Sequence, residues 1–235
     1  MSLQLEQVHS HYGKSHVLQG VTLNVGNREI ICLLGRNGVG KSTTMKTIMG
    51  LVPPSSGSIR FNGTAVDRMA TYRIARLGVG YVPEERRIFP TVTVRENLLM
   101  GMKPSVNAGI RPWTLERIYE YFPRLKERAQ QRAGTLSGGE QQMLTIGRTL
   151  MGNPELVLID EPTEGLAPMI VEEVQRIIVA IHQAGASILL VEQAIDTAFA
   201  LAHRVYVMSK GTIVYSGTTE DLKSNSAVRR QYLEV

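Results

Sequence analysis

One stretch of the sequence, GRNGVGKST from Gly35 to Thr43, restricts the possible folds more than any other and matches the pattern GxxxxGKS. The run REIICLL before it is apolar after its first charges, which predicts a strand covered on both faces. The residues after it, STTMKTIMGL, show helical spacing and reach a glycine with two prolines beyond. A glycine-rich loop between a buried strand and a helix is typical of a phosphate-binding loop.

The chemistry of this loop follows from its residue types. Glycines let successive backbone N–H groups converge on phosphate oxygens, and the helix N-terminus adds its positive end. We expect Lys41 to bridge the terminal phosphates of a nucleotide and the Ser42 hydroxyl to bind Mg²⁺. The loop residues expected to bind the nucleotide are Gly35, Asn37, Gly38, Gly40, Lys41, Ser42 and Thr43.

Further patterns extend the α/β reading along the chain. The N-terminal stretches LQLEQV and VTLNV alternate apolar and polar residues, which predicts half-buried antiparallel strands. LVLID and SILLV predict buried parallel strands, with an amphipathic helix from Pro168 to Gly185 between them. The tail RVYVMSKGTIVYSG predicts a hairpin that turns at Ser209 to Gly211.

Composition places limits on the class of protein. The 235 residues, of which 43% are hydrophobic, suit one large domain with a substantial core. No apolar run approaches the roughly 18 residues of a membrane span, and the N-terminus lacks the features of a signal peptide, so we expect a soluble chain that stays inside the cell. The single cysteine, Cys32, lies in an apolar run and is expected to be a packed strand residue. The net charge of +5 comes without a dense basic tract, and only 6% of the residues are aromatic, so we expect no nucleic-acid partner.

Two carboxylates follow the predicted strand LVLID. Asp160 lies at its carboxyl end, where ligands of open α/β sheets bind, and Glu161 comes next. We expect Asp160 to bind Mg²⁺ and Glu161 to orient and deprotonate the attacking water, because phosphoryl transfer depends mainly on positioning and charge stabilisation around the metal.

The heptapeptide LSGGEQQ supports two compatible interpretations. Ser137 and Glu140 form the pattern of a capping box at the start of a helix. The same serine, with Gly138 and Gly139 at a helix N-terminus, also makes an anion-binding element. One chain needs only one phosphate-binding element, so the second indicates service to another chain's nucleotide.

The three motifs GRNGVGKST, LSGGEQQ and LVLIDEP, in this order, resemble those of ABC ATPases over essentially the whole chain. The resemblance implies an α/β fold with a P-loop NTPase (RecA-like) core and a mixed sheet, preceded by an N-terminal antiparallel β-subdomain. It implies a single domain over residues 1–235, with the core at 1–90 and 151–235. The segment 91–150, whose helical pattern breaks around Pro104 to Pro112, is expected to be an inserted helical subdomain.

In that family two ATPase domains pair head to tail, so that Ser137, Gly138 and Gly139 would contact the partner's ATP. Glu164 to Pro168, EGLAP, resembles the loop at the dimer interface. Tyr12 in HYGKSH resembles the aromatic residue that stacks on adenine, although a tyrosine after a strand is as often simple packing.

The chain departs from the family pattern at two positions. YVPEERRIFP has Glu84 where these ATPases usually have glutamine, and LLVEQ has Gln193 where they usually have histidine. We expect Glu84 to be a Mg²⁺ ligand that adds negative charge beside the phosphates. Gln193 can hydrogen-bond the γ-phosphate but cannot become a cation. The sequence therefore suggests that the chain's own ATP site is the slower one of an asymmetric pair.

Together VPE, VEQ and GLAP resemble one importer branch, the LivF-type ATPases of branched-chain amino acid uptake. The resemblance implies ATP and Mg²⁺ as cofactors and a peripheral place on the cytoplasmic side of the inner membrane. The implied partners are a second ABC ATPase, two transmembrane permeases and a periplasmic solute-binding protein. Related importers carry urea, short amides or aromatic acids, so the cargo stays open. A soluble ABC protein of DNA repair or translation is the alternative from another class.

Two features are left without a firm role. His9, His11 and His16 lie close together, but no cysteine or carboxylate pair completes a zinc-like set, so we expect ordinary strand or surface histidines. The stretch from Phe89 to Met102 is either a groove for a permease helix or subdomain core, with Phe89, Val92, Val94, Leu98 and Leu99 as its apolar residues.

Overall fold

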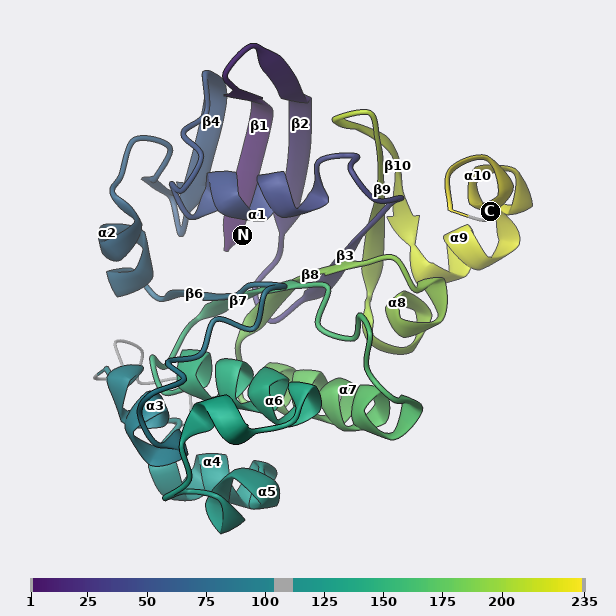
Figure 1. Ribbon diagram of the computed structural model, residues 1–235. Coiled ribbons are helices and arrows are strands. Elements are labelled where there is room, and N and C mark those ends of the chain that lie inside the picture. Colours follow the sequence, from purple (N-terminus) through teal and green to yellow (C-terminus); the bar gives the residue numbers. More distant parts are fainter. Residues whose placement is uncertain (1, 104–111, 234–235) are drawn as a thin grey trace.

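Two β-sheets and ten α-helices make up the part of the chain described by the computed structural model, residues 2–103 and 112–233 (Figure 1). A four-stranded sheet lies at one end of the molecule, and a six-stranded sheet crosses its middle. The fold is therefore α/β with a mixed central sheet, as the sequence predicts. Within the described residues no helix is long and apolar enough to cross a membrane.

The N-terminal sheet is antiparallel, with the strand order β2-β1-β4-β5. Its strands are β1 (Leu3–Tyr12), β2 (Ser15–Val25), β4 (Ser56–Phe61) and β5 (Thr64–Ala65). Leu3, Leu5 and Val8 of β1 are buried while Glu6 and Gln7 are exposed, so one face packs inward and the other meets solvent. The alternation read from the sequence is confirmed.

The central sheet has the order β10-β9-β3-β8-β7-β6. It contains β3 (Ile30–Leu34), β6 (Val79–Val82), β7 (Leu156–Asp160), β8 (Ser187–Glu192), β9 (Arg204–Ser209) and β10 (Thr212–Thr218). All neighbours are parallel except β9 and β10, which form the predicted hairpin. β3, β7 and β8 are buried along their whole length, as expected of strands covered on both faces.

Each face of the central sheet has its own core. Ile31 and Leu33 of β3 pack with the N-terminal sheet and with α1 (Lys41–Ile48), whereas Cys32 and Leu34 face the helices on the other side. Figure 1 shows α6 (Gly138–Leu150) and α7 (Pro168–Gln183) running beneath the sheet on that second side. The single cysteine is fully buried, as predicted.

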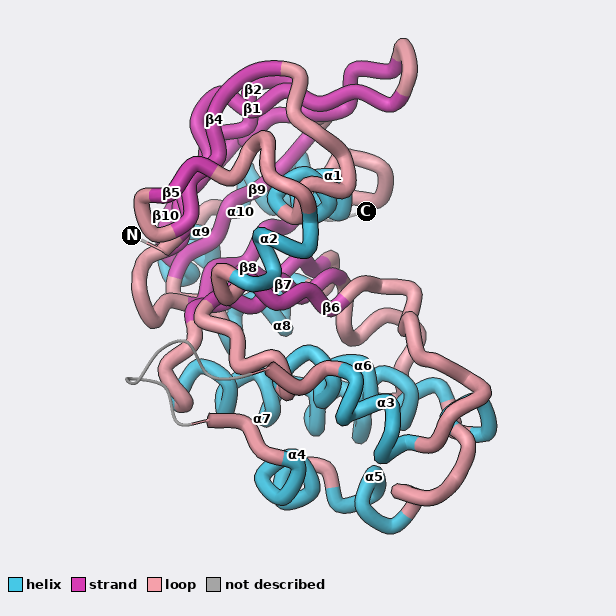
Figure 2. Tube along the Cα trace, turned by 90° about the vertical axis from the view of Figure 1, so that its left-hand side faces the viewer, coloured by secondary structure: helices cyan, strands magenta, loops and turns pink. Residues whose placement is uncertain are grey.

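Helices dominate the segment between β6 and β7. They are α3 (Val94–Met100), α4 (Leu115–Tyr121), α5 (Pro123–Glu127), the 3₁₀ turn Ala133–Thr135 and α6. Figure 2 shows α3, α4 and α5 at the end of the molecule opposite the N-terminal sheet. Most of the predicted break around Pro104 to Pro112 lies outside the described residues.

Short helices complete the fold. α2 (Thr71–Arg76) lies beside the N-terminal sheet, α8 (Ile195–Leu201) follows β8, and α9 (Thr219–Ser224) and α10 (Ser226–Tyr232) follow β10. Leu222 of α9 is fully buried, and Val228 and Tyr232 of α10 pack against the same core. The C-terminal helices thus cover the β9 end of the central sheet.

An ion pair connects the start of β9 to the loop before β3. Arg204 donates from Nε to Glu29 Oε1 at 2.6 Å and from Nη2 to Glu29 Oε2 and Asn24 Oδ1 at 3.1 and 2.8 Å. Burial raises the pKa of Glu29, but the hydrogen bonds from Arg204 and from the Gly26 N–H outweigh it and hold that pKa below its ordinary value of 4.5. The pair therefore adds to stability only while Glu29 is ionised.

We expect Glu29→Gln to lower the free energy of unfolding at pH 7 by about 1 kcal/mol, because the pair is partly exposed and screened by solvent. A carboxyl whose pKa is lowered by folding stabilises above its unfolded pKa and loses that contribution as the pH falls through its folded pKa. The difference between variant and parent in urea unfolding should therefore shrink from pH 7 to pH 4. A difference that stays constant over this range would contradict the assignment.

Candidate functional site

The glycine-rich loop joins β3 to α1, as predicted, and its backbone can be formed only by glycine at two positions. Gly40, the N-cap of α1, has φ 112°, which is in the left-handed region. A Cβ on Gly35 would lie 2.5 Å from the carbonyl oxygen of Met208, so the loop passes against β9 without room for a side chain. The loop therefore presents its N–H groups at the N-terminus of an eight-residue helix.

Lys41 is folded into this loop. Its Nζ donates to the carbonyl oxygens of Gly35 and Arg36 at 2.9 and 3.1 Å and lies 2.9 Å from Glu161 Oε1. The lysine is 3% exposed and the side chain of Glu161 is 7% exposed, so the ion pair is buried. The buried Lys41 ammonium therefore has an acceptor for each of its three N–H donors. A ligand that replaces one of these acceptors must supply oxygen atoms in its place.

Asp160 ends β7 and accepts one hydrogen bond on each carboxylate oxygen. Ser42 Oγ donates to Oδ1 at 3.0 Å and Tyr81 OH donates to Oδ2 at 3.1 Å. Burial raises the pKa of Asp160 to about 6; the hydrogen bonds from Ser42 and Tyr81 act in the opposite direction, and the charges of Glu161 and Glu84 raise the pKa further. Ser42 and Asp160, two of the three predicted metal ligands, are therefore in direct contact, and the third, Glu84, lines the same cavity as Ser42.

Glu161 is the first residue after β7 and has φ 44°, which is uncommon for a residue with a side chain. Its Oε2 accepts a hydrogen bond from Gln193 Nε2 at 2.8 Å, while its Oε1 faces Lys41. Gln193 also donates to Asn37 Oδ1 in the phosphate loop. The residue found where related ATPases have histidine thus links the loop to the carboxylate expected to activate water.

These groups line a cavity of about 290 Å³. Its walls contain every predicted loop residue except Gly35, together with three carboxylates and Val17. The lining residues are Val17, Asn37, Gly38, Gly40, Lys41, Ser42, Thr43, Glu84, Glu161 and Glu164. Burial, followed by the charges of Glu161 and Glu84, raises the pKa of Glu164. The cavity therefore combines phosphate-binding backbone, one buried lysine and an excess of acidic groups.

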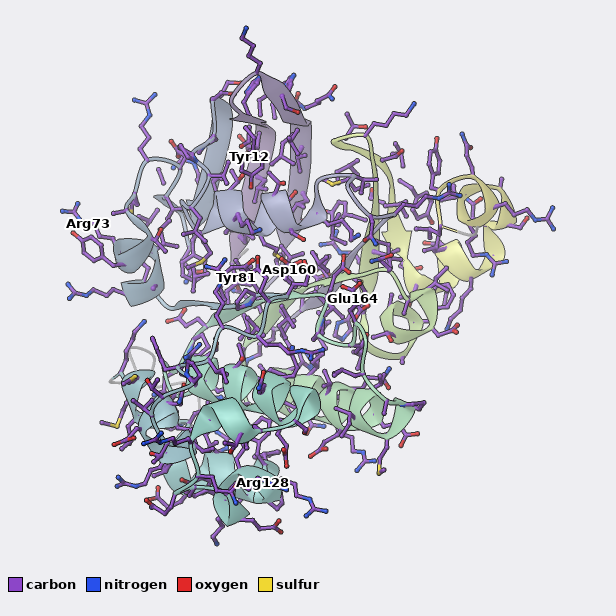
Figure 3. All side chains as sticks on the ribbon, viewed as in Figure 1. Tyr12, Arg73, Tyr81, Arg128, Asp160 and Glu164 are labelled. Atoms are coloured by element: carbon purple, nitrogen blue, oxygen red, sulfur yellow. The ribbon has the colours of Figure 1, made fainter. Side chains whose placement is uncertain are left out.

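Tyr12 and the first residues of LSGGEQQ are not among the residues that line this cavity. Tyr12 ends β1, is 48% exposed and is not one of the cavity's lining residues (Figure 3). Its stacking on adenine stays a prediction. Ser137, Gly138 and Gly139 are also not lining residues of this cavity.

The predicted capping box at the start of α6 is confirmed. Ser137 Oγ accepts from the Glu140 N–H at 3.4 Å, and Glu140 Oε2 accepts from the Ser137 N–H at 2.9 Å. Arg128 Nε lies 2.6 Å from Glu140 Oε1 and holds that carboxylate from the side. The box fixes the position of the two glycines that follow Ser137.

Two residues that the sequence analysis did not identify, Arg86 and Tyr81, connect the elements of the site. Arg86 has φ 43° and donates from Nη2 to the Glu164 carbonyl oxygen at 3.1 Å, and its guanidinium lies against Gly138. Tyr81 lies on β6 and reaches Asp160. Tyr81 precedes the predicted metal ligand Glu84 by only three residues in VGYVPE, and this closeness in sequence is the signal that could have identified Tyr81.

The three histidines lie together in space. His9 Nδ1 is 3.0 Å from His16 Nε2, and the rings of His11 and His16 stack with centroids 4.2 Å apart. In residues 2–103 and 112–233 no group of three or more His, Cys, Asp or Glu residues could hold a metal ion. Stacking and the hydrogen bond to Ser55 from His11 account for this cluster.

A phosphate loop, a strand-end aspartate and a neighbouring glutamate at the carboxyl edge of a parallel sheet define a P-loop nucleotide-binding domain. A family profile described as ABC transporter matches residues 18–164 of the chain. The chain belongs to the ABC transporter family, as an ATP-binding subunit with ATPase activity.

Known proteins resemble the chain over nearly their whole length. The high-affinity branched-chain amino acid transport ATP-binding protein BraG of Pseudomonas aeruginosa is 44% identical over 98% of this chain and 99% of its own. The lipopolysaccharide export system ATP-binding protein LptB of Escherichia coli is 31% identical over 94% of this chain and 92% of its own. A solved structure of an ATP-binding subunit of an ABC transporter superposes with a TM-score of 0.81 at 30% identity, covering 98% of this chain and 93% of that one.

Ser137→Ala tests whether the capping residue has a second role, and Thr218→Ala is its matched control, because Thr218 forms a complete capping box with Asp221 on α9. Each change should lower the free energy of unfolding by about 1 kcal/mol. We expect only Ser137→Ala to reduce ATP turnover, by about tenfold or more, because a lost donor to the phosphate acts on the transition state. Equal ATP turnover in the two variants would show that Ser137 caps α6 and has no second role.

Proposed function

We propose that this chain is the ATP-hydrolysing subunit of an importer for branched-chain amino acids. The observation that carries the proposal is the 44% identity to BraG over nearly the full length of both proteins, supported by a cavity that the glycine-rich loop lines together with Lys41 and Glu161. Full-length similarity at this level supports the same role as a motor, which binds ATP and never contacts the cargo. Urea and short amides are the alternative cargoes, and the copurification experiment described below distinguishes them from branched-chain amino acids.

The mechanism starts from the buried ion pair. A bound nucleotide offers phosphate oxygens to Lys41, which would exchange Glu161 for the terminal phosphates. Glu161, released from the lysine but still held by Gln193 at 2.8 Å, could then accept a proton from water. The N–H groups of the loop and the N-terminus of α1 would bind the remaining phosphate charge.

Magnesium fits this site because the available donors are hydroxyl and carboxylate oxygens. Ser42 and Asp160, already 3.0 Å apart, would hold it, and Glu84 in the same cavity would supply a further carboxylate. The chain supplies only part of a coordination shell, which suits an ion that is bound together with nucleotide phosphates. When bound, the metal neutralises charge on the phosphates and on the surrounding carboxylates.

The residues at the start of α6 would serve a second ATPase subunit. The cavity of this chain is lined without Ser137, Gly138 or Gly139, and the N-terminus of the 13-residue α6 is an anion-binding element of its own. A head-to-tail pair would place these residues on the ATP of the other subunit. The loop Glu164 to Pro168 would lie at that interface, and Tyr12 would stack on the adenine.

A groove of about 540 Å³ is the proposed docking site for a permease. Phe89, 49% exposed, and Met100, 57% exposed, line it, whereas Val94 and Leu98 are fully buried and belong to the subdomain core. Only part of the predicted stretch is therefore available to a partner. The Asn97 side chain forms two hydrogen bonds of 2.9 Å with the backbone of Phe89, so the backbone that carries this ring is fixed.

These partners would place the chain on the cytoplasmic face of the inner membrane, with two permeases and a periplasmic solute-binding protein completing the importer. Within the chain, we propose residues 1–90 and 151–235 as the core and 91–150 as the helical subdomain. The proposed groove lies where these two parts meet. Ala75, Tyr81 and Phe89 belong to the core, and Met100 and Arg148 belong to the helical subdomain.

Phe89→Ala should weaken copurification of the permeases from detergent extracts, by about tenfold in apparent affinity, because it removes an exposed aromatic side chain from the groove. Val214→Ala, which truncates an exposed residue on β10, should leave recovery unchanged. The binding protein of the recovered complex should take up a branched-chain amino acid. Recovery of ribosomes or DNA in place of permeases would contradict a role in transport, and a urea-binding partner would change the cargo.

The acidic Glu84 and neutral Gln193 support a slower site on this chain than on a different partner ATPase. Glu161→Gln should lower turnover at its own site by about 10²- to 10⁴-fold. We expect it to reduce ATP hydrolysis of the whole complex only in part, while the matching change in the partner abolishes hydrolysis. The opposite outcome, or a complex that contains only copies of this chain, would contradict the asymmetry.

A further inference from the structure

Tyr81 touches two regions that the preceding sections describe separately. It is one of the residues that line the 540 Å³ groove beside Phe89 and Met100. Its hydroxyl donates a hydrogen bond of 3.1 Å to Asp160 Oδ2. Figure 3 shows Tyr81 and Asp160 side by side in the middle of the molecule.

The pairing of strands explains how one side chain reaches both. On β6, Tyr81 is the register partner of Leu158, two residues before the end of β7, so its ring extends along the sheet toward Asp160. Its carbonyl oxygen accepts a hydrogen bond of 3.3 Å from Thr149 Oγ1 on α6. Ser137 is the N-cap of the same α6, so the backbone of Tyr81 is also attached to the helix at whose start the second phosphate-binding element is proposed.

The two hydrogen bonds to Asp160 are not equivalent. Ser42 belongs to the phosphate loop and would turn to the metal when nucleotide and Mg²⁺ bind. Tyr81 is not part of that loop and its hydroxyl would stay on Oδ2, so that it fixes the orientation of the carboxylate. Partners that orient a metal ligand in this way typically change metal affinity by 10- to 100-fold when they are removed.

We propose that Tyr81 is a positioning residue that connects the permease-docking groove to the metal-binding carboxylate of the ATP site. A partner that packs in the groove contacts the wall formed by Tyr81 and thereby changes the position of its hydroxyl on Asp160. Occupancy of the groove is then sensed at the metal site through one side chain. The sensing of a permease rests on the proposed function, whereas the orientation of Asp160 does not.

Tyr81→Phe is the test variant because it removes the hydroxyl and keeps both the backbone and the ring of the residue. Tyr119→Phe is the control, because the Tyr119 hydroxyl is buried and makes no hydrogen bond within the described residues. The first readout uses the isolated chain: binding of Mn²⁺, followed by its electron paramagnetic resonance signal, in the presence of a non-hydrolysable ATP analogue. We expect Tyr81→Phe to weaken Mn²⁺ binding about tenfold and Tyr119→Phe to leave it unchanged.

The second readout uses the assembled complex. We expect Tyr81→Phe to copurify with the permeases as well as the parent does, but to lose most of the stimulation of ATP hydrolysis that the permeases cause, while Tyr119→Phe keeps it. Unchanged Mn²⁺ binding would overturn the role at Asp160, and unchanged stimulation would overturn the coupling. If the parent chain recovers no permease, the proposed function is contradicted instead. The Mn²⁺ result then still decides whether the Tyr81 hydroxyl positions Asp160.

Discussion

The register of three parallel strands is the constraint on which the site depends. Leu34 of β3 pairs with Glu192 of β8, and Asp160 of β7 pairs with Val191, so the three strands end at the same edge of the sheet. The phosphate loop, Glu161 and Gln193 follow these ends, and Asp160 is itself the last residue of β7. A shift of one residue in any strand would turn its side chains to the other face and separate these groups. Burial of the strands on both faces holds the register in place.

Electrostatics then determines what this edge can bind. Lys41 is buried among carboxylates and is neutralised by Glu161 at 2.9 Å, while Asp160, Glu84 and Glu164 remain as further acidic groups. Phosphate oxygens alone would meet repulsion from these carboxylates, whereas phosphates that arrive with a divalent cation would not. Burial raises the pKa of Asp160 to about 6, and the charges of Glu161 and Glu84 contribute in the same direction. The ion pair is thus an internal substitute for the contacts that a nucleotide would make.

Local patterns in the sequence predict the parts of this molecule well. The alternation in β1, the continuous apolar run of β3, the glycine loop and the capping box at Ser137 each depend on a few neighbouring residues, and all are present in the structure. Contacts between distant segments could not be predicted in the same way. The hydrogen bonds of Tyr81 to Asp160 and of Arg86 to Glu164 span 79 and 78 residues and depend on how the elements pack. The left-handed backbone of Glu161 and Arg86 likewise leaves no mark in residue type, because both positions hold residues that rarely adopt it.

The most direct test of the account is a structure of the chain bound to Mg²⁺ and a non-hydrolysable ATP analogue. The account predicts that Lys41 Nζ leaves Glu161 and contacts the terminal phosphates, that Ser42 Oγ leaves Asp160 for the metal, and that Gln193 keeps its hydrogen bond to Glu161. A nucleotide bound elsewhere, with Lys41 and Glu161 still paired at 2.9 Å, would contradict it.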